Sequence, residues 1–323
     1  MGGAGDGAAP VTLSMDIFVQ QLVNGLVLGA IYALVALGYT LVYGILELIN
    51  FAHGEVTMMG AMIALAVIHA LVEMQTGLPG SLILLTGMSV AILGCMALGF
   101  TIERIAYRPL RNAPRLAPLI TAIGVSIVLQ NVAMLIWGRQ YIAFPPILPS
   151  GRHAFFGATL TDLQIFIFLL SCLVMTGLVW LTQKTRLGRA MRATAEAPQI
   201  ASLMGVNVNQ VIGLTFIIGS ALAAVAGVMD AAYYGIAHYY MGFNLGLKAF
   251  SAAVLGGIGN LKGAMLGGLL LGLLESVGAG YIGDLTGGFL GSNYQDVFAF
   301  FVLILVLVFR PNGLLGQQVV ERP

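Results

Sequence analysis

Residues 23–44 read VNGLVLGAIYALVALGYTLVYG and contain no Asp, Glu, Lys or Arg. A helix needs about 20 mostly apolar residues to cross the hydrocarbon core of a bilayer. A helix that is apolar on all sides belongs in a membrane or at the centre of a large core. This stretch therefore predicts a transmembrane helix.

The composition of the whole chain agrees with this prediction. The 323 residues include 14 Lys and Arg, 13 Asp and Glu and 43 Gly, and 59% of the chain is hydrophobic. Soluble domains carry about 25% charged residues, whereas the share here is 8%. A soluble globular fold is excluded, so most segments must face membrane lipid or one another. The net charge of +1 gives no reason to expect a nucleic-acid partner.

Hydrophobicity predicts eight clear spans and one uncertain span. The uncertain segment, 244–257, is short, contains Lys248 and is interrupted by glycines, which suits a half-helix shielded by protein. The predicted fold is an all-α polytopic membrane protein with eight to nine transmembrane helices. The clear spans are 17–44, 56–72, 82–103, 118–137, 163–182, 210–229, 264–282 and 295–309.

Basic residues predict the orientation, because Lys and Arg concentrate in cytoplasmic loops. They cluster after the third span, after the fifth span and in the tail. Either 244–257 crosses the membrane or the tail lies outside, and we favour nine crossings with an external N-terminus. The predicted organisation is a disordered tail (1–15), a membrane domain (16–310) with a cytoplasmic loop (184–209), and a cytoplasmic tail (311–323).

The first and sixth spans have similar Gly and Ala spacing, and each leads to a polar break followed by a shorter helix. Because they would run in opposite directions, they indicate an inverted repeat that relates spans 1–4 to spans 6–9. Coincidence in a Gly/Ala-rich chain is the alternative. Small residues four apart, such as Gly25 and Gly29, predict close helix packing.

Polar residues follow the first span at Glu47, Asn50, His53 and Glu55. Ionisable groups near membrane depth are costly, so Asn50, His53 and Glu55 are candidates to face a pathway or a partner chain. The alternative is a cytoplasmic turn in which Asn50 or His53 caps the next helix. One His beside two Glu lacks the spacing of a zinc or iron site, so no metal is predicted.

A second polar set surrounds the sixth to eighth spans. Lys248 and Glu275 are further pathway candidates that could pair across neighbouring helices, as structural contacts more than as a proton relay. Asp230 and His238 are expected at a helix end or in a loop, where water solvates them.

The long basic loop predicts a short helix of about two turns. It would start at Thr194 or Glu196, just before Pro198, and stop at Gly205. Its apolar residues recur three and four positions apart and form one face suited to docking on another protein. A basic loop lying on anionic headgroups is the alternative. The apolar residues are Ile200, Leu203 and Met204.

The sequence contains no phosphate loop of the form GxxxxGK[ST], no HExxH and no GxSxG. The chain is therefore predicted to have no catalytic residues and no cofactor of its own. A proton- or ion-coupled secondary carrier remains an alternative to an ATP-driven transporter, because intramembrane charges are present. A passive channel would need a ring of filter groups, and an intramembrane enzyme a reactive cluster.

Four long motifs carry a resemblance: YALVALGYTLVYG (32–44), INFAHGE (49–55), ERIAYRPLR (103–111) and AAVLGGIG (252–259). Together they closely resemble the LivH-type permeases of high-affinity branched-chain amino acid ABC importers. The similarity extends over about residues 15–318, and several motifs in order make it specific. Related permeases move other amino acids, amides or urea.

The resemblance implies a type II ABC importer fold in the bacterial inner membrane. It implies a second, LivM-like permease, two cytoplasmic ATPase subunits that bind ATP and Mg, and a periplasmic amino-acid-binding protein. Residues 188–207 match the position of the family's coupling segment, although Glu196-Ala197-Pro198 departs from the common EAAxxxG form. The coupling residues implied are Glu196, Ala197, Ile200, Ala201, Leu203, Met204 and Gly205.

Overall fold

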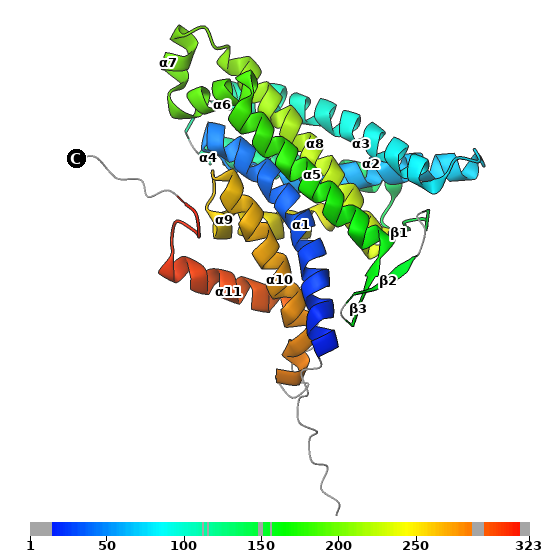
Figure 1. Cartoon of the computed structure of the whole chain (residues 1–323). Coiled ribbons are helices and arrows are strands. Elements are labelled where there is room, and N and C mark those ends of the chain that lie inside the picture. The colour runs from blue at the N-terminus through cyan, green and yellow to red at the C-terminus, as the bar shows by residue number, and fades with distance from the viewer. Residues whose placement is uncertain are drawn as a thin grey trace, which may run out of the picture.

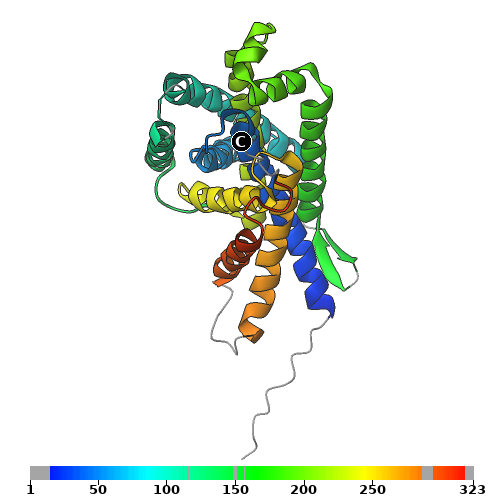
Figure 2. The same ribbon diagram turned by 90° about the vertical axis from the view of Figure 1, so that its left-hand side faces the viewer.

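The computed structural model describes residues 15–316 except 112, 115, 148–150, 156 and 286–293. Most of the predicted tails, residues 1–14 and 317–323, therefore lie outside the described residues. The described chain is a helical bundle with two small strand pairs at one end (Figures 1 and 2).

Seven helices in the described part of the chain are long and apolar enough to cross a membrane. They are α1 (Met15–Leu46), α2 (His53–Glu73), α3 (Gly80–Ile102), α4 (Leu116–Trp137), α5 (Asp162–Lys184), α8 (Val208–Tyr234) and α10 (Leu261–Leu285). α3 continues through a π-turn, η1 (Glu103–Tyr107), and a 3₁₀ turn, η2 (Arg108–Leu110).

The remaining elements are shorter. The helices are α6 (Arg186–Glu196), α7 (Pro198–Leu203), α9 (Met241–Gly256) and α11 (Gln295–Phe309). Strand β1 (Ile142–Ala143) pairs antiparallel with β4 (Ile236–Ala237), and β2 (Arg152–Phe155) pairs antiparallel with β3 (Ala158–Thr161).

The all-α membrane fold is confirmed, but the prediction of eight to nine spans is slightly too high. α11 coincides with the predicted span 295–309, yet its 15 residues rise only about 22 Å, less than the ~30 Å hydrocarbon core. α9 has 16 residues and is similarly short. α8 ends at Gly235, whose φ of 72° favours glycine, and strand β4 follows before α9 can begin.

Helices α1 and α8 pack side by side in opposite directions. Near the start of α1, the Gln20 side chain bonds the backbone of Thr159 on β3, and the end of α8 leads into β4. The start of α1 and the end of α8 thus lie at the strand end of the bundle, opposite α6 and α7 (Figure 1). This arrangement agrees with the predicted inverted repeat.

The second helix of each repeat begins inside the bundle. His53 opens α2 beside Gly38, which lies well before the end of α1, so residues 47–52 fold back along α1. The first turn of α9 lies against the first turn of α2, because a Cβ at Gly54 would collide with the carbonyl of Gly242. α2 then runs to the strand end, while α9 runs toward α6. The two N-termini therefore meet in the interior.

Glycines allow the long helices α1 and α10 to touch through their backbones, as the small-residue spacing predicts. A Cβ at Gly25 would lie 2.8 Å from Cα of Leu273, and one at Gly29 would lie 2.8 Å from Cα of Leu269. Both distances are too short for a side chain. This close approach anchors α1 at the centre of the fold.

Candidate functional site

The turn before α2 is held by Asn50. Its Oδ1 accepts hydrogen bonds from the backbone N–H of Ala52 (3.1 Å) and from the Tyr107 hydroxyl (2.9 Å). The N-cap of α2 is Ala52 and makes no side-chain capping bond, so the predicted cap by Asn50 or His53 is wrong. Asn50 instead ties the break to η1, which explains why a polar residue is buried there.

His53 is buried between α1 and α2. Its ring meets Tyr39 edge-on at 4.8 Å between centroids, and a Cβ at Gly38 would collide with it. Its Nε2 atom has no hydrogen-bond partner among the described residues. A solvated turn is therefore not the environment of this histidine.

Glu55 lies in the first turn of α2 and is 1% exposed. One carboxylate oxygen, Oε1, accepts hydrogen bonds from Gln130 (2.6 Å) and Ser126 (3.3 Å) of α4. The other oxygen, Oε2, has no hydrogen-bond partner in the described part of the chain.

Glu55 also lines a cavity of about 260 Å³ between α2, α4 and α9. The walls are aromatic and aliphatic apart from this carboxylate and the hydroxyls of Ser126 and Tyr39. The lining residues are Tyr39, Phe51, Glu55, Ile123, Ser126, Gly242, Phe243, Gly246, Leu247 and Phe250.

Lys248 and Glu275 lie on the other side of α9, away from this cavity. The predicted pair is confirmed, with Lys248 Nζ 2.7 Å from Glu275 Oε1. Tyr32 donates to Glu275 Oε2 (2.9 Å), and Asp296 Oδ1 lies 2.8 Å from Lys248 Nζ. The cluster joins α1, α9, α10 and α11. The five pathway candidates therefore separate into two sites.

The prediction for Asp230 is right in placing it near a helix end and wrong in expecting water to solvate it. It lies four residues before the end of α8, where neighbouring helices bury it, and it interacts electrostatically with Lys248 and Glu275. His238 lies in the turn between β4 and α9, as predicted, but is only partly exposed, and its Nε2 atom bonds the Arg139 carbonyl (3.1 Å). The long apolar pattern of α8 predicts a helix, but it does not indicate which residues at the helix end are covered by neighbouring helices.

The loop between α5 and α8 contains two helices instead of one. Thr185 caps α6 by accepting from the backbone N–H of Gly188 (3.1 Å). α7 follows with Pro198 in its first turn, as predicted, and stops before Gly205, whose φ of 84° suits glycine. The predicted start at Thr194 or Glu196 is wrong because both residues belong to α6.

Three apolar side chains of α7 and its end project from the bundle. Ile200, Leu203 and Met204 are 62%, 87% and 81% exposed, while Ala201 is buried against the body of the protein. We call Ile200, Leu203 and Met204 the α7 patch. It lies at the tip of the bundle opposite the strands (Figure 1). Exposed apolar side chains grouped at one tip are typical of an interaction site.

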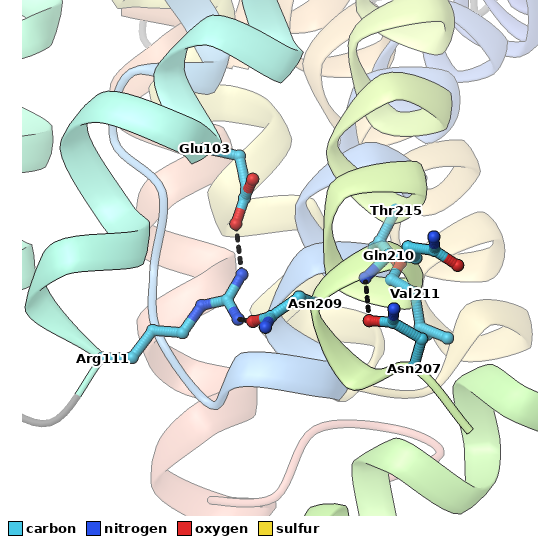
Figure 3. Close-up of polar contacts among 7 residues, drawn as sticks. All are labelled: Glu103, Arg111, Asn207, Asn209, Gln210, Val211 and Thr215. Atoms are coloured by element: carbon cyan, nitrogen blue, oxygen red, sulfur yellow. Dashed lines mark hydrogen bonds and ion pairs between the residues drawn. The ribbon is translucent and has the colours of Figure 1, made fainter. Parts of the chain in front are cut away.

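A polar junction connects η1 and Arg111 to the start of α8, which follows α7 in the chain (Figure 3). Arg111 donates to the buried carboxylate of Glu103 in η1 and to Asn209 Oδ1 at the start of α8 (2.6 Å). Asn207 caps α8 by accepting from Gln210 N–H (3.2 Å). The sequence interpretation treated Arg111 only as a cytoplasmic charge and missed this junction.

A larger cavity of about 790 Å³ opens between the end of α1, helix α6, the α9–α10 turn and residues 311–316. Arg192 of α6 lines it and donates to the Thr182 carbonyl at the end of α5. In the described residues, no group of three or more His, Cys, Asp and Glu side chains could hold a metal ion.

Comparison with known proteins places these features in a family. The family described as "Branched-chain amino acid transport system / permease component" matches residues 21–307. The chain belongs to this family. As a member, it is a multi-pass membrane permease component, in agreement with the resemblance carried by its motifs.

Individual permeases are similar over nearly their whole length. The high-affinity branched-chain amino acid transport system permease protein BraD of Pseudomonas aeruginosa is 50% identical over 94% of this chain and 98% of its own. The permease protein LivH of Escherichia coli is 46% identical over 94% and 97%. A probable LivH of Methanocaldococcus jannaschii is 28% identical over 94% and 95%. No solved structure matches.

Proposed function

We propose that this permease is a subunit of a high-affinity ABC importer in the bacterial inner membrane and forms half of the pathway for branched-chain amino acids. The observation that carries the proposal is the 50% identity to BraD across nearly both chains. A LivM-like second permease completes the pathway. A periplasmic binding protein delivers the amino acid, and two cytoplasmic ATPase subunits bind ATP and Mg.

The α7 patch is the proposed contact with an ATPase subunit. Its side chains are exposed, and four basic residues precede it in the loop, as expected on the cytoplasmic side. The residues around the patch hold α7 in place. Glu196 and Ala197 form the joint between α6 and α7, Ala201 forms the buried side of α7, and Gly205 follows its end. The Arg111 junction would carry movement of α7 to α3 and α8.

Energy supply from partner chains explains why the buried charges need not relay protons. Lys248 and Glu275 form an ion pair with each other. The sequence has no GxxxxGK[ST] loop that would bind ATP. Catalysis is therefore assigned to the ATPase subunits, and the chain itself acts in transport.

Copurification tests the assembly. A tagged chain should bring down a second permease and two nucleotide-binding chains from its native membrane. Met204→Asp should leave the chain in the membrane but uncouple ATP hydrolysis from uptake. Met74→Asp is the matched control, because Met74 is similarly exposed but lies after α2 at the strand end. Normal coupling in Met204→Asp, or equal loss in both variants, would refute the docking role.

A further inference from the structure

The cavity beside Glu55 contains one carboxylate among its lining residues. Glu55 is 1% exposed, and its Oε2 atom has no partner among the residues described. A buried carboxylate oxygen without a hydrogen bond is costly, so this oxygen is suited to pair with a donor that enters the cavity.

Two helix N-termini lie beside this carboxylate. Glu55 lies in the first turn of α2, and Gly242, in the first turn of α9, lies against its side chain. A Cβ at Gly242 would be 2.7 Å from Glu55 Oε2, so any larger residue would fill the space in front of this oxygen. Helix N-termini stabilise the negative charge of a carboxylate, and the carboxylate is the group here that can pair with a cation.

The remaining walls are suited to an apolar group and to a cation. Phe250 lies 5.9 Å from Phe51 and 6.2 Å from Tyr39 between ring centroids, so these three rings form a continuous wall. Phe243 and Leu247 of α9 and Ile123 of α4 complete the opening side. Aromatic faces attract ammonium groups, and the aliphatic walls bury hydrocarbon.

We propose that this cavity is a transit site for aliphatic amino acids, in which Glu55 pairs with the substrate ammonium group and the aromatic wall holds its side chain. The volume of about 260 Å³ is slightly below that of pockets for drug-sized ligands, as a smaller solute requires. The inference rests on the proposed function and adds a binding site within the permease, downstream of the selection made by the binding protein.

Saturation-transfer NMR on the purified transporter complex in nanodiscs, without binding protein, tests the site. L-leucine methyl protons should receive saturation from the wild-type complex. 3-Methylbutylamine, which keeps the ammonium group, should compete, and 4-methylpentanoate, which lacks it, should not. Glu55→Gln should lower the leucine signal about tenfold or more, as expected for loss of a charge-assisted hydrogen bond.

Phe243→Ala provides a second variant in case Glu55→Gln does not assemble, because Phe243 is partly exposed on the opening side. It should lower the leucine signal about threefold or more, as expected for loss of apolar contact. Phe301→Ala, exposed on α11 and outside the cavity lining, should leave the signal unchanged. An unchanged signal in Glu55→Gln or Phe243→Ala, or equal competition by the two leucine analogues, would overturn the proposal.

ATP-driven leucine uptake separates this inference from the proposed function. If the wild-type complex with its binding protein takes up no branched-chain amino acid, the proposed function fails. If it takes up leucine but the NMR signal is the same in the wild type, Glu55→Gln and Phe243→Ala, only the proposal of the transit site fails. If the proposed site is correct, Glu55→Gln should reduce the kcat of leucine uptake about tenfold. ATP hydrolysis stimulated by the binding protein should persist.

Discussion

Removing Lys248 should destabilise the bundle, and removing its partner as well should restore stability. Lys248 and Glu275 side chains are 14% and 1% exposed and meet at 2.7 Å. Breaking such a buried pair costs about 3–5 kcal/mol, because one charge stays buried without its partner. Tyr32 would still donate to Glu275, so Lys248→Met should lower the free energy of unfolding by about 3 kcal/mol.

The double variant Lys248→Met/Glu275→Gln should lie within about 1 kcal/mol of the wild type, because neither member of the pair is left charged without the other. Glu275→Gln alone should cost less than Lys248→Met, since Lys248 keeps Asp296 at 2.8 Å. The coupling energy of the double-mutant cycle should then be about 3 kcal/mol.

SDS titration of the purified complex, followed by circular dichroism, measures these free energies, and leucine uptake is measured on the same preparations. A structural pair predicts that the double variant both folds and transports. Equal stability of the wild type and Lys248→Met would refute the structural reasoning. A stable double variant without uptake would instead assign the pair a part in transport.

Three further changes test the packing and the coupling route. Gly29→Ala should lower the free energy of unfolding by about 1–3 kcal/mol in the same titration, because its Cβ would lie 2.8 Å from the α10 backbone. Gly124→Ala is the control, because its Cβ would meet open space, and it should leave the free energy of unfolding unchanged. Arg111→Ala should lower the free energy of unfolding by about 3 kcal/mol, because the buried carboxylate of Glu103 loses its charged partner. It should also lower the ratio of leucine uptake to ATP hydrolysis. An unchanged ratio would exclude the junction from coupling. Leu203→Ala should weaken binding of the ATPase subunit about 10–30-fold in a titration, since about 2 kcal/mol of apolar burial is lost, and Met74→Ala should have no effect.

Much of the fold was predictable because membrane spans leave a strong local signal. The apolar run at 23–44 predicts α1, and Pro198 with Gly205 brackets α7, since each signal lies within a few adjacent residues. α11 was over-counted because hydrophobicity reports composition, while crossing a bilayer depends on helix length.

The sites were only partly predictable because their partners come from distant parts of the chain. Lys248 and Glu275 could be matched by charge alone, as few charges are available. Glu55 was identified as a candidate, but Ser126 and Gln130 on α4 carry no sequence signal that connects them to it. The π-turn η1 changes the helical phase, so the contact between Glu103 and Arg111 follows no regular spacing.

Uptake into proteoliposomes tests the central claim most directly. The complete complex is reconstituted with the binding protein and radiolabelled leucine on the side of the membrane opposite the ATPase subunits. Leucine should cross to the ATPase side only when ATP and Mg reach the ATPase subunits. An imposed proton gradient without ATP should give no accumulation. Leucine accumulation driven by the gradient alone, or by this chain without ATPase subunits, would contradict the account of an ATP-driven permease subunit.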